Sequence, residues 1–197
     1  LNLFFFIFFL YFINSMYPFR IMNQLEYKLL QNGLVVGIEE NNSVETVAMH
    51  LAIPAGISSS MNDGDGAILS ELIQRGVYGY TAIEYQNAID RLGIKKTVSC
   101  GNDFIFISAT MLSNKFIDAV PLIFSLVLDP TLPANDLEAC KSLCLQSIDS
   151  VKDDPSTLAA MELKRIHYPE PFNRTGYGQK NCIKNATIEQ IQSHANK

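Results

Sequence analysis

The stretch Gly66-Ala67-Ile68-Leu69-Ser70-Glu71-Leu72-Ile73-Gln74-Arg75-Gly76 decides how this chain is interpreted. Its residues 67–75 are predicted to form a helix that follows a glycine-rich turn. Positions i, i+3 and i+4 share one helix face, so Ile68, Glu71 and Leu72 are expected to project into one cleft. Two ligands at i and i+4 beside an acid are typical of a catalytic zinc site, but isoleucine and leucine have no lone pair to offer.

Four further segments occur in a fixed order around this helix. They are Tyr27-Lys28-Leu29-Leu30-Gln31-Asn32-Gly33-Leu34-Val35-Val36, Ile53-Pro54-Ala55-Gly56-Ile57-Ser58, Asp153-Asp154-Pro155 and Pro171-Phe172-Asn173-Arg174-Thr175-Gly176-Tyr177-Gly178. From about Leu25 to its end, the chain resembles the N-terminal domain of the pitrilysin/insulinase-type zinc metallopeptidases, the inverzincins that include mitochondrial-processing-peptidase-like proteins. The order and separation of the segments carry this resemblance more strongly than any one of them.

The resemblance implies a zinc site that has lost its ligands. In the active enzymes H-x-x-E-H supplies two zinc-binding histidines and a glutamate that activates water. Here Ile68 and Leu72 stand at the histidine positions, and only Glu71 is kept, as a relic base. A third ligand, a glutamate about seventy-five residues farther on, is matched by Ser147. No metal or other cofactor is therefore expected, although active relatives bind zinc.

Other interpretations of these residues stay open. Glu71 is better explained as a solvated or hydrogen-bonded structural residue that borders a cleft. Cys140 and Cys144 lie at i and i+4 on an apolar stripe, where they can pack as small hydrophobic residues. A replacement metal site built from Cys144 and Glu71 is the alternative.

Two functions follow from these alternatives. In the preferred one, the chain is a non-catalytic peptidase homologue that acts as a substrate-binding or structural partner of a homologous zinc-bearing subunit or half, with unfolded peptide as a ligand. In the other, it is a zinc metallopeptidase with relocated ligands, among them Glu71, Cys144 and a residue from outside. Enzymatic activity is left open between them, because the motif reads I-x-x-E-L.

Composition narrows the class of protein. The 197 residues are 48% hydrophobic and 18% charged, which fits one globular domain with a buried core. The net charge of -5 and the absence of interleaved basic and aromatic residues argue against nucleic acid as a partner. Four cysteines without a paired framework fit a reducing compartment.

The two ends of the chain set the expected domain boundaries. Residues 1–13 are almost wholly apolar but shorter than a spanning helix, and they lack the basic start and cleavage site of a signal peptide. Residues 1–21 are therefore interpreted as an upstream artefact or apolar leader, residues 22–197 as the domain, and the cytoplasm as the preferred location. A degenerate secretion signal is the alternative, with a periplasmic or secreted protein. The resemblance implies further strands, so the domain is expected to be incomplete at its C-terminus.

Patterning predicts an α+β fold in which helices pack on one face of a mainly antiparallel sheet. Thr81 and Glu84 form a capping-box pattern at the start of one helix. The predicted strands and hairpins cover residues 27–40, 44–54, 96–100 and 104–111, and the predicted helices cover residues 67–75, 81–92, 114–128, 137–151 and 183–194.

Overall fold

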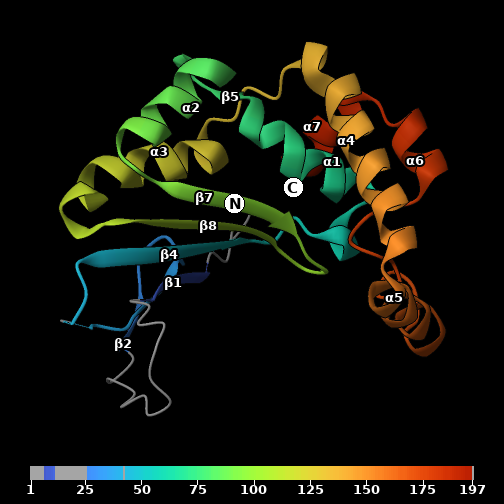
Figure 1. Cartoon of the computed structure of the whole chain (residues 1–197), viewed down its shortest axis with the longest axis horizontal. Coiled ribbons are helices and arrows are strands. Elements are labelled where there is room, and N and C mark those ends of the chain that lie inside the picture. The colour runs from blue at the N-terminus through green and yellow to red at the C-terminus, as the bar shows by residue number, and fades with distance from the viewer. Residues whose placement is uncertain (1–6, 12–25, 42, 197) are drawn as a thin grey trace.

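The computed structural model describes residues 7–11, 26–41 and 43–196, and for residues 7–11 it describes the backbone alone. In chain order the elements are β1 (Ile7–Tyr11), β2 (Glu26–Leu29), β3 (Val35–Ile38), β4 (Thr46–Ile53), α1 (Asp65–Leu72), β5 (Gly76–Val77), β6 (Tyr80–Thr81), α2 (Ala82–Arg91), β7 (Lys95–Cys100), β8 (Ile105–Leu112), α3 (Phe116–Leu128), α4 (Leu137–Ser150), α5 (Pro155–His167), α6 (Lys180–Asn185) and α7 (Ile188–Ala195). Figure 1 shows their arrangement.

The main sheet has six strands in the order β2-β3-β1-β4-β8-β7. Strand β1 runs parallel to β3 and antiparallel to β4, and every other ladder of this sheet is antiparallel. A second, two-stranded sheet joins β5 to β6. The predicted α+β class with a mainly antiparallel sheet is confirmed.

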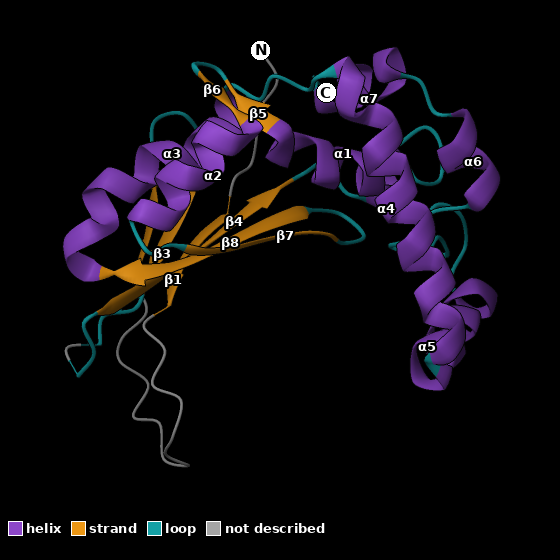
Figure 2. Ribbon diagram, turned by 45° about the horizontal axis from the view of Figure 1, so that its top comes forward, coloured by secondary structure: helices purple, strands orange, loops and turns teal. Residues whose placement is uncertain are grey.

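One face of the sheet carries the core. Along β8, burial alternates strictly, because successive side chains of a strand point to opposite faces. Ile105, Ile107, Ala109 and Met111 are buried in the core together with residues of α1, α2 and α3, and these helices lie on the same side of the sheet in Figure 2. The prediction that helices pack on one face of the sheet is therefore confirmed.

The elements that were predicted correctly have strong local signals in the sequence. The Asn32-Gly33 turn joins β2 to β3, with Gly33 at a φ of +84° that favours glycine. The capping box at the start of α2 is formed: Thr81 Oγ1 accepts from the Glu84 backbone N–H, and Glu84 Oε2 accepts from the Thr81 backbone N–H. These contacts fix the start of α2 at Ala82.

Two expectations need correction or stay untested. The continuous helix predicted for residues 183–194 is wrong, because it breaks between α6 and α7, where Ala186 is extended and Thr187 caps a new helix. The proposed boundary at residue 21 remains a prediction: β1 lies in the sheet, while residues 1–6 and 12–25 lie outside the described ranges. None of the helices in the described ranges combines the length and apolar character needed to cross a membrane.

Candidate functional site

A cavity lies where α1, β7 and α4 meet. Its volume is about 340 Å³, and its lining side chains include Ala67, Ser70, Glu71, Cys100, Cys144 and Ser147. We call it the α4-side cavity. The structure thus brings together Glu71 and Ser147, two of the residues that the sequence singled out, and adds Cys144 from the alternative interpretation.

Ile68 and Leu72 do not reach this cavity, so the expectation that they share a cleft with Glu71 is wrong. Both side chains are 0% exposed and belong to the hydrophobic core. The α1 face on the cavity consists of Ala67, Ser70 and Glu71, which have the same i, i+3, i+4 spacing one residue earlier. At the positions where a catalytic helix would present two ligands and an acid, α1 therefore presents a methyl group, a carboxylate and a hydroxyl.

The sequence missed this face because α1 is buried nearly all round. Every α1 residue except Glu71 is buried, so hydrophobic periodicity gives little sign of which side faces a cleft. The available signal was side-chain size. Ala67 and Ser70 are the small residues one turn before and beside Glu71, whereas Ile68 and Leu72 are large aliphatic residues suited to a core.

Two hydroxyl groups of the cavity, those of Ser70 and Ser147, are engaged by their own helices. Ser70 Oγ donates to the Ala67 carbonyl oxygen at 2.8 Å, and Ser147 Oγ donates to the Leu143 carbonyl oxygen at 3.0 Å. Such bonds to the preceding turn satisfy serine within a helix. In the absence of a histidine beside it, neither serine has an activating base.

The cysteines of the cavity are held as neutral thiols. Burial, and next the nearby negative charge of Glu71, raise the pKa of Cys144 to about 12. Burial also raises the pKa of Cys100 to about 12. Because the thiolate is the nucleophile and the metal ligand, these side chains serve as apolar lining at neutral pH.

Zinc does not fit this set of donors. A catalytic zinc ion needs three protein ligands, and the cavity offers one carboxylate beside hydroxyls and protonated thiols. Across the described ranges, no three His, Cys, Asp or Glu side chains are grouped so that they could hold a metal ion. No step of a metal-dependent reaction is therefore derived from these residues.

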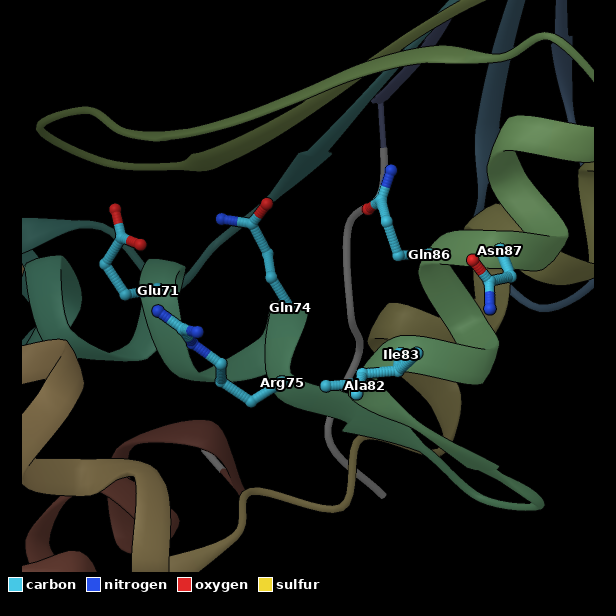
Figure 3. A pocket seen from close by; sticks show the side chains of 7 residues that line it. All are labelled: Glu71, Gln74, Arg75, Ala82, Ile83, Gln86 and Asn87. Atoms are coloured by element: carbon cyan, nitrogen blue, oxygen red, sulfur yellow. The ribbon is translucent and has the colours of Figure 1, made fainter.

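A second cavity lies on the other side of Glu71, between the end of α1 and α2. Its volume is about 410 Å³, and Glu71, Gln74, Arg75, Gln86 and Asn87 supply its polar lining. We call it the α2-side cavity. Figure 3 shows Glu71, Gln74 and Gln86 directed toward the side on which the strands lie. Glu71 is thus the shared wall of two adjacent cavities.

Lys96 of β7 ties the strand to α1. Its Nζ donates to Gln74 Oε1 at 3.2 Å and lies 5.3 Å from the centre of the Tyr85 ring, while Gln74 Nε2 donates to the Ser70 carbonyl oxygen at 3.0 Å. Burial lowers the pKa of Lys96, and the charge of Glu71 acts in the opposite direction. These contacts hold β7 against the end of α1.

Strand β7 forms one edge of the sheet, and within the described ranges it pairs only with β8. The Gly101 backbone N–H donates to the Phe104 carbonyl oxygen at 2.8 Å in the connecting turn. Antiparallel pairs alternate between hydrogen-bonded and non-hydrogen-bonded. The backbone N–H and C=O groups of Lys96, Val98 and Cys100 therefore point away from β8. The edge is open at Lys96 and Val98, whereas a Cβ atom at Gly176 would lie 3.3 Å from the Cys100 carbonyl oxygen, so the segment at Gly176 covers the edge there.

The fold of this chain is the one seen in solved structures of the M16 peptidase fold. One solved structure with this fold is a peptidase M16 inactive domain from Pseudomonas fluorescens, with a TM-score of 0.78 and 23% identity over 87% of this chain and 43% of that chain. Another is a protease from Helicobacter pylori, with a TM-score of 0.77 and 15% identity over 87% of this chain and 42% of that chain.

These similarities confirm, at the level of the fold, the resemblance to pitrilysin/insulinase-type peptidases. The chain spans less than half the length of either of these two proteins. No family model and no curated protein sequence matches the chain.

Proposed function

We propose that this chain is a non-catalytic domain of the M16 peptidase fold that binds an extended, unfolded peptide along β7. It acts as the substrate-binding partner of a homologous subunit or half that carries zinc. The observation that carries the proposal is the open edge of β7 beside a cavity whose α1 and α4 faces lack a zinc-ligand set.

The loss of chemistry is supported by the residues at the cavity. Ala67 cannot coordinate a metal ion, and the hydroxyls of Ser70 and Ser147 bond to their own helices. Glu71 is left as a carboxylate without a cation to lower the pKa of a bound water. A peptide held here would not meet an activated nucleophile.

Peptide binding is supported by the geometry of the edge. An extended peptide can add a strand to an exposed sheet edge, where main-chain hydrogen bonds supply affinity and pockets for alternate side chains supply specificity. The outward N–H and C=O groups of Lys96 and Val98 supply the first requirement. The α4-side cavity, which Val98 and Cys100 of β7 help to line, supplies the second. The α2-side cavity lies beyond Glu71, where Lys96 contacts Gln74.

Binding is tested with a fluorescein-labelled unfolded oligopeptide and a set of variants N-methylated at one backbone position each. Fluorescence anisotropy should report saturable binding. Methylation should weaken binding at alternate positions only, because every second peptide N–H pairs with the strand. Absence of saturable binding, or equal weakening at successive positions, would contradict strand addition.

Catalysis is tested separately on the same purified chain. Elemental analysis after purification in zinc-supplemented buffer should give far less than one zinc ion per chain, and the labelled peptide should stay uncleaved. The readout of binding does not depend on this result, so the two halves of the proposal can fail independently.

One observation favours the second candidate, a zinc peptidase with relocated ligands. Glu71 and Cys144 line the same cavity, as that alternative requires. Stoichiometric zinc together with chelator-sensitive cleavage would establish it. A Cys144→Ala variant should then lose both, and an Ile117→Ala variant on the surface of α3 should keep both.

A further inference from the structure

The α4-side cavity presents hydrogen-bond acceptors and a negative charge to a ligand. Among the described residues that line it, Glu71 is the only carboxylate, and none is a lysine, arginine or histidine. Ser70 and Ser147 have each used their one hydroxyl proton in a bond to a carbonyl oxygen of the preceding turn. Each hydroxyl oxygen therefore keeps only lone pairs for a ligand. These three side chains together favour a ligand group that carries donors and a positive charge.

The Glu71 carboxylate is not neutralised by a neighbour. None of the ion pairs between described residues involves Glu71, and Arg75, four residues later, forms none with it. The charge of Glu71 acts on Lys96, but the Lys96 ammonium group donates to Gln74 Oε1 and lies over the Tyr85 ring. Glu71 is also the one residue of α1 that is not buried, so a ligand can reach its carboxylate.

A peptide strand on β7 would bring a side chain to this cavity. Val98 and Cys100 line it, so it lies on the sheet face to which these two side chains point. Directly opposite residues on neighbouring strands project to the same face, with Cβ atoms about 4.5–5.5 Å apart. The peptide residue opposite Val98, where the edge is open, therefore directs its side chain at the cavity. The cavity volume of about 340 Å³ lies in the range of pockets that take small ligands.

We propose that the α4-side cavity is a specificity pocket for a lysine or arginine side chain of the bound peptide, with Glu71 as its counter-ion. Both side chains carry donors and no acceptor, which matches the lining of acceptors. Their aliphatic stems can lie along Ala67 and Val98, while the charged head reaches Glu71. Hydrogen bonds between ionised groups are stronger than neutral ones, so this contact can select the peptide. The inference rests on the proposed binding of peptide at β7.

The preference is measured with three fluorescein-labelled, end-blocked peptides that differ at one central residue, which is lysine, norleucine or glutamate. Fluorescence anisotropy should give a dissociation constant about tenfold lower for the lysine peptide than for the norleucine peptide, with the glutamate peptide weakest. Norleucine keeps the aliphatic stem and lacks the ammonium group, so the ratio reports the charged group. Saturable binding with equal dissociation constants for lysine and norleucine would overturn the pocket and leave peptide binding at β7 standing.

The variant Glu71→Gln tests the counter-ion. It should abolish the preference for lysine over norleucine, and unchanged circular dichroism spectra will show that it folds. The matched control is Glu26→Gln, which makes the same change at an exposed position of β2, at the opposite edge of the six-stranded sheet. This control should keep the preference. Equal loss in both variants would mean that the net charge of the chain attracts lysine, and it would overturn the pocket.

The register of the peptide separates the pocket from strand addition. If the cavity holds the lysine side chain, moving lysine by one residue along the peptide should shift by one residue the positions at which N-methylation weakens binding. An alternating pattern that stays fixed when lysine moves would overturn the pocket and support strand addition. Absence of alternation, or of saturable binding by any of the peptides, would overturn the proposed function as well.

Discussion

Glu71 on α1 and Ser147 on α4 line one cavity, although they are far apart in the sequence. Ala67 and Ser70 stand beside Glu71 on the same helix face, while Ile68 and Leu72 are buried in the core. The face of α1 that carries chemistry in a catalytic relative is therefore fixed by contact with α4 and β7, and it begins at Ala67.

This register predicts how a zinc site can be rebuilt. The triple variant Ala67→His, Glu71→His, Ser147→Glu should bind one zinc ion per chain with a dissociation constant below about 1 µM, because its three ligands face one cavity. Isothermal titration calorimetry measures the affinity and the stoichiometry. The wild-type chain is the reference and should show no such binding.

The register predicted from the sequence, with Ile68 and Leu72 at the ligand positions, provides the matched control. The triple variant Ile68→His, Leu72→His, Ser147→Glu should bind no zinc, because its histidines would enter the core. Each histidine should cost about 2–5 kcal/mol in the free energy of unfolding, measured by urea denaturation. Zinc uptake by this variant and not by the first would show that Ile68 and Leu72 face the cavity after all.

Asp63 should make stability depend on pH. Its side chain is buried, and its Oδ1 has no hydrogen-bond partner in the described ranges. Burial raises its pKa above the ordinary value of 3.8, against the opposing charge of Arg174. The folded state therefore holds this proton more tightly than the unfolded state does. The contribution of this proton to the free energy of unfolding is fully present below pH 3.8 and is lost as the pH rises through the raised pKa.

The variant Asp63→Asn tests this effect. It should unfold at higher urea concentration than the wild type at pH 7, and the difference should shrink as the pH falls toward 3. A variant that is less stable than the wild type at pH 7 would mean that attraction to Arg174 outweighs the cost of burial.

The position of β1 makes the start of the domain testable. Removing residues 1–21 removes the strand between β3 and β4, so both strands gain an open edge. Hydrogen exchange should become faster at the backbone amides of Val35–Ile38 in the shortened chain, while Ile105–Leu112 stays protected by its two neighbouring strands. Unchanged exchange in β3 would instead favour a domain that begins at Met22.

The cap of α7 should contribute measurably to the free energy of unfolding. Thr187 Oγ1 accepts from the Gln190 backbone N–H, and Gln190 Oε1 accepts from the Thr187 backbone N–H at 2.9 Å. Thr187→Ala should lower the free energy of unfolding by about 1 kcal/mol, and Thr187→Ser should nearly restore it. Equal losses for both variants would indicate that the hydroxyl is not the stabilising group.

Elements with strong local signals could be predicted from the sequence. The Asn32-Gly33 turn, the capping box at Thr81 and the alternation along β8 each fix an element without help from distant residues. The break at Ala186–Thr187 carried a similar signal, since Thr187 and Gln190 match a capping box. The apolar pattern nevertheless predicts one continuous helix, because it continues across the break.

Contacts between distant segments could not be predicted in the same way. Which face of α1 meets α4 depends on tertiary packing, and α1 is too uniformly buried for periodicity to reveal it. The insertion of β1 between β3 and β4 depends on a pairing that no local residue encodes.

Because the carboxylate of Glu71 borders both cavities, side chains that bind in the two should be thermodynamically linked. A basic side chain that draws this carboxylate toward one cavity withdraws its charge from the other. The side-chain preferences at the two corresponding peptide positions should therefore be correlated. A peptide library in which one position is varied at a time would give the wrong preference at both.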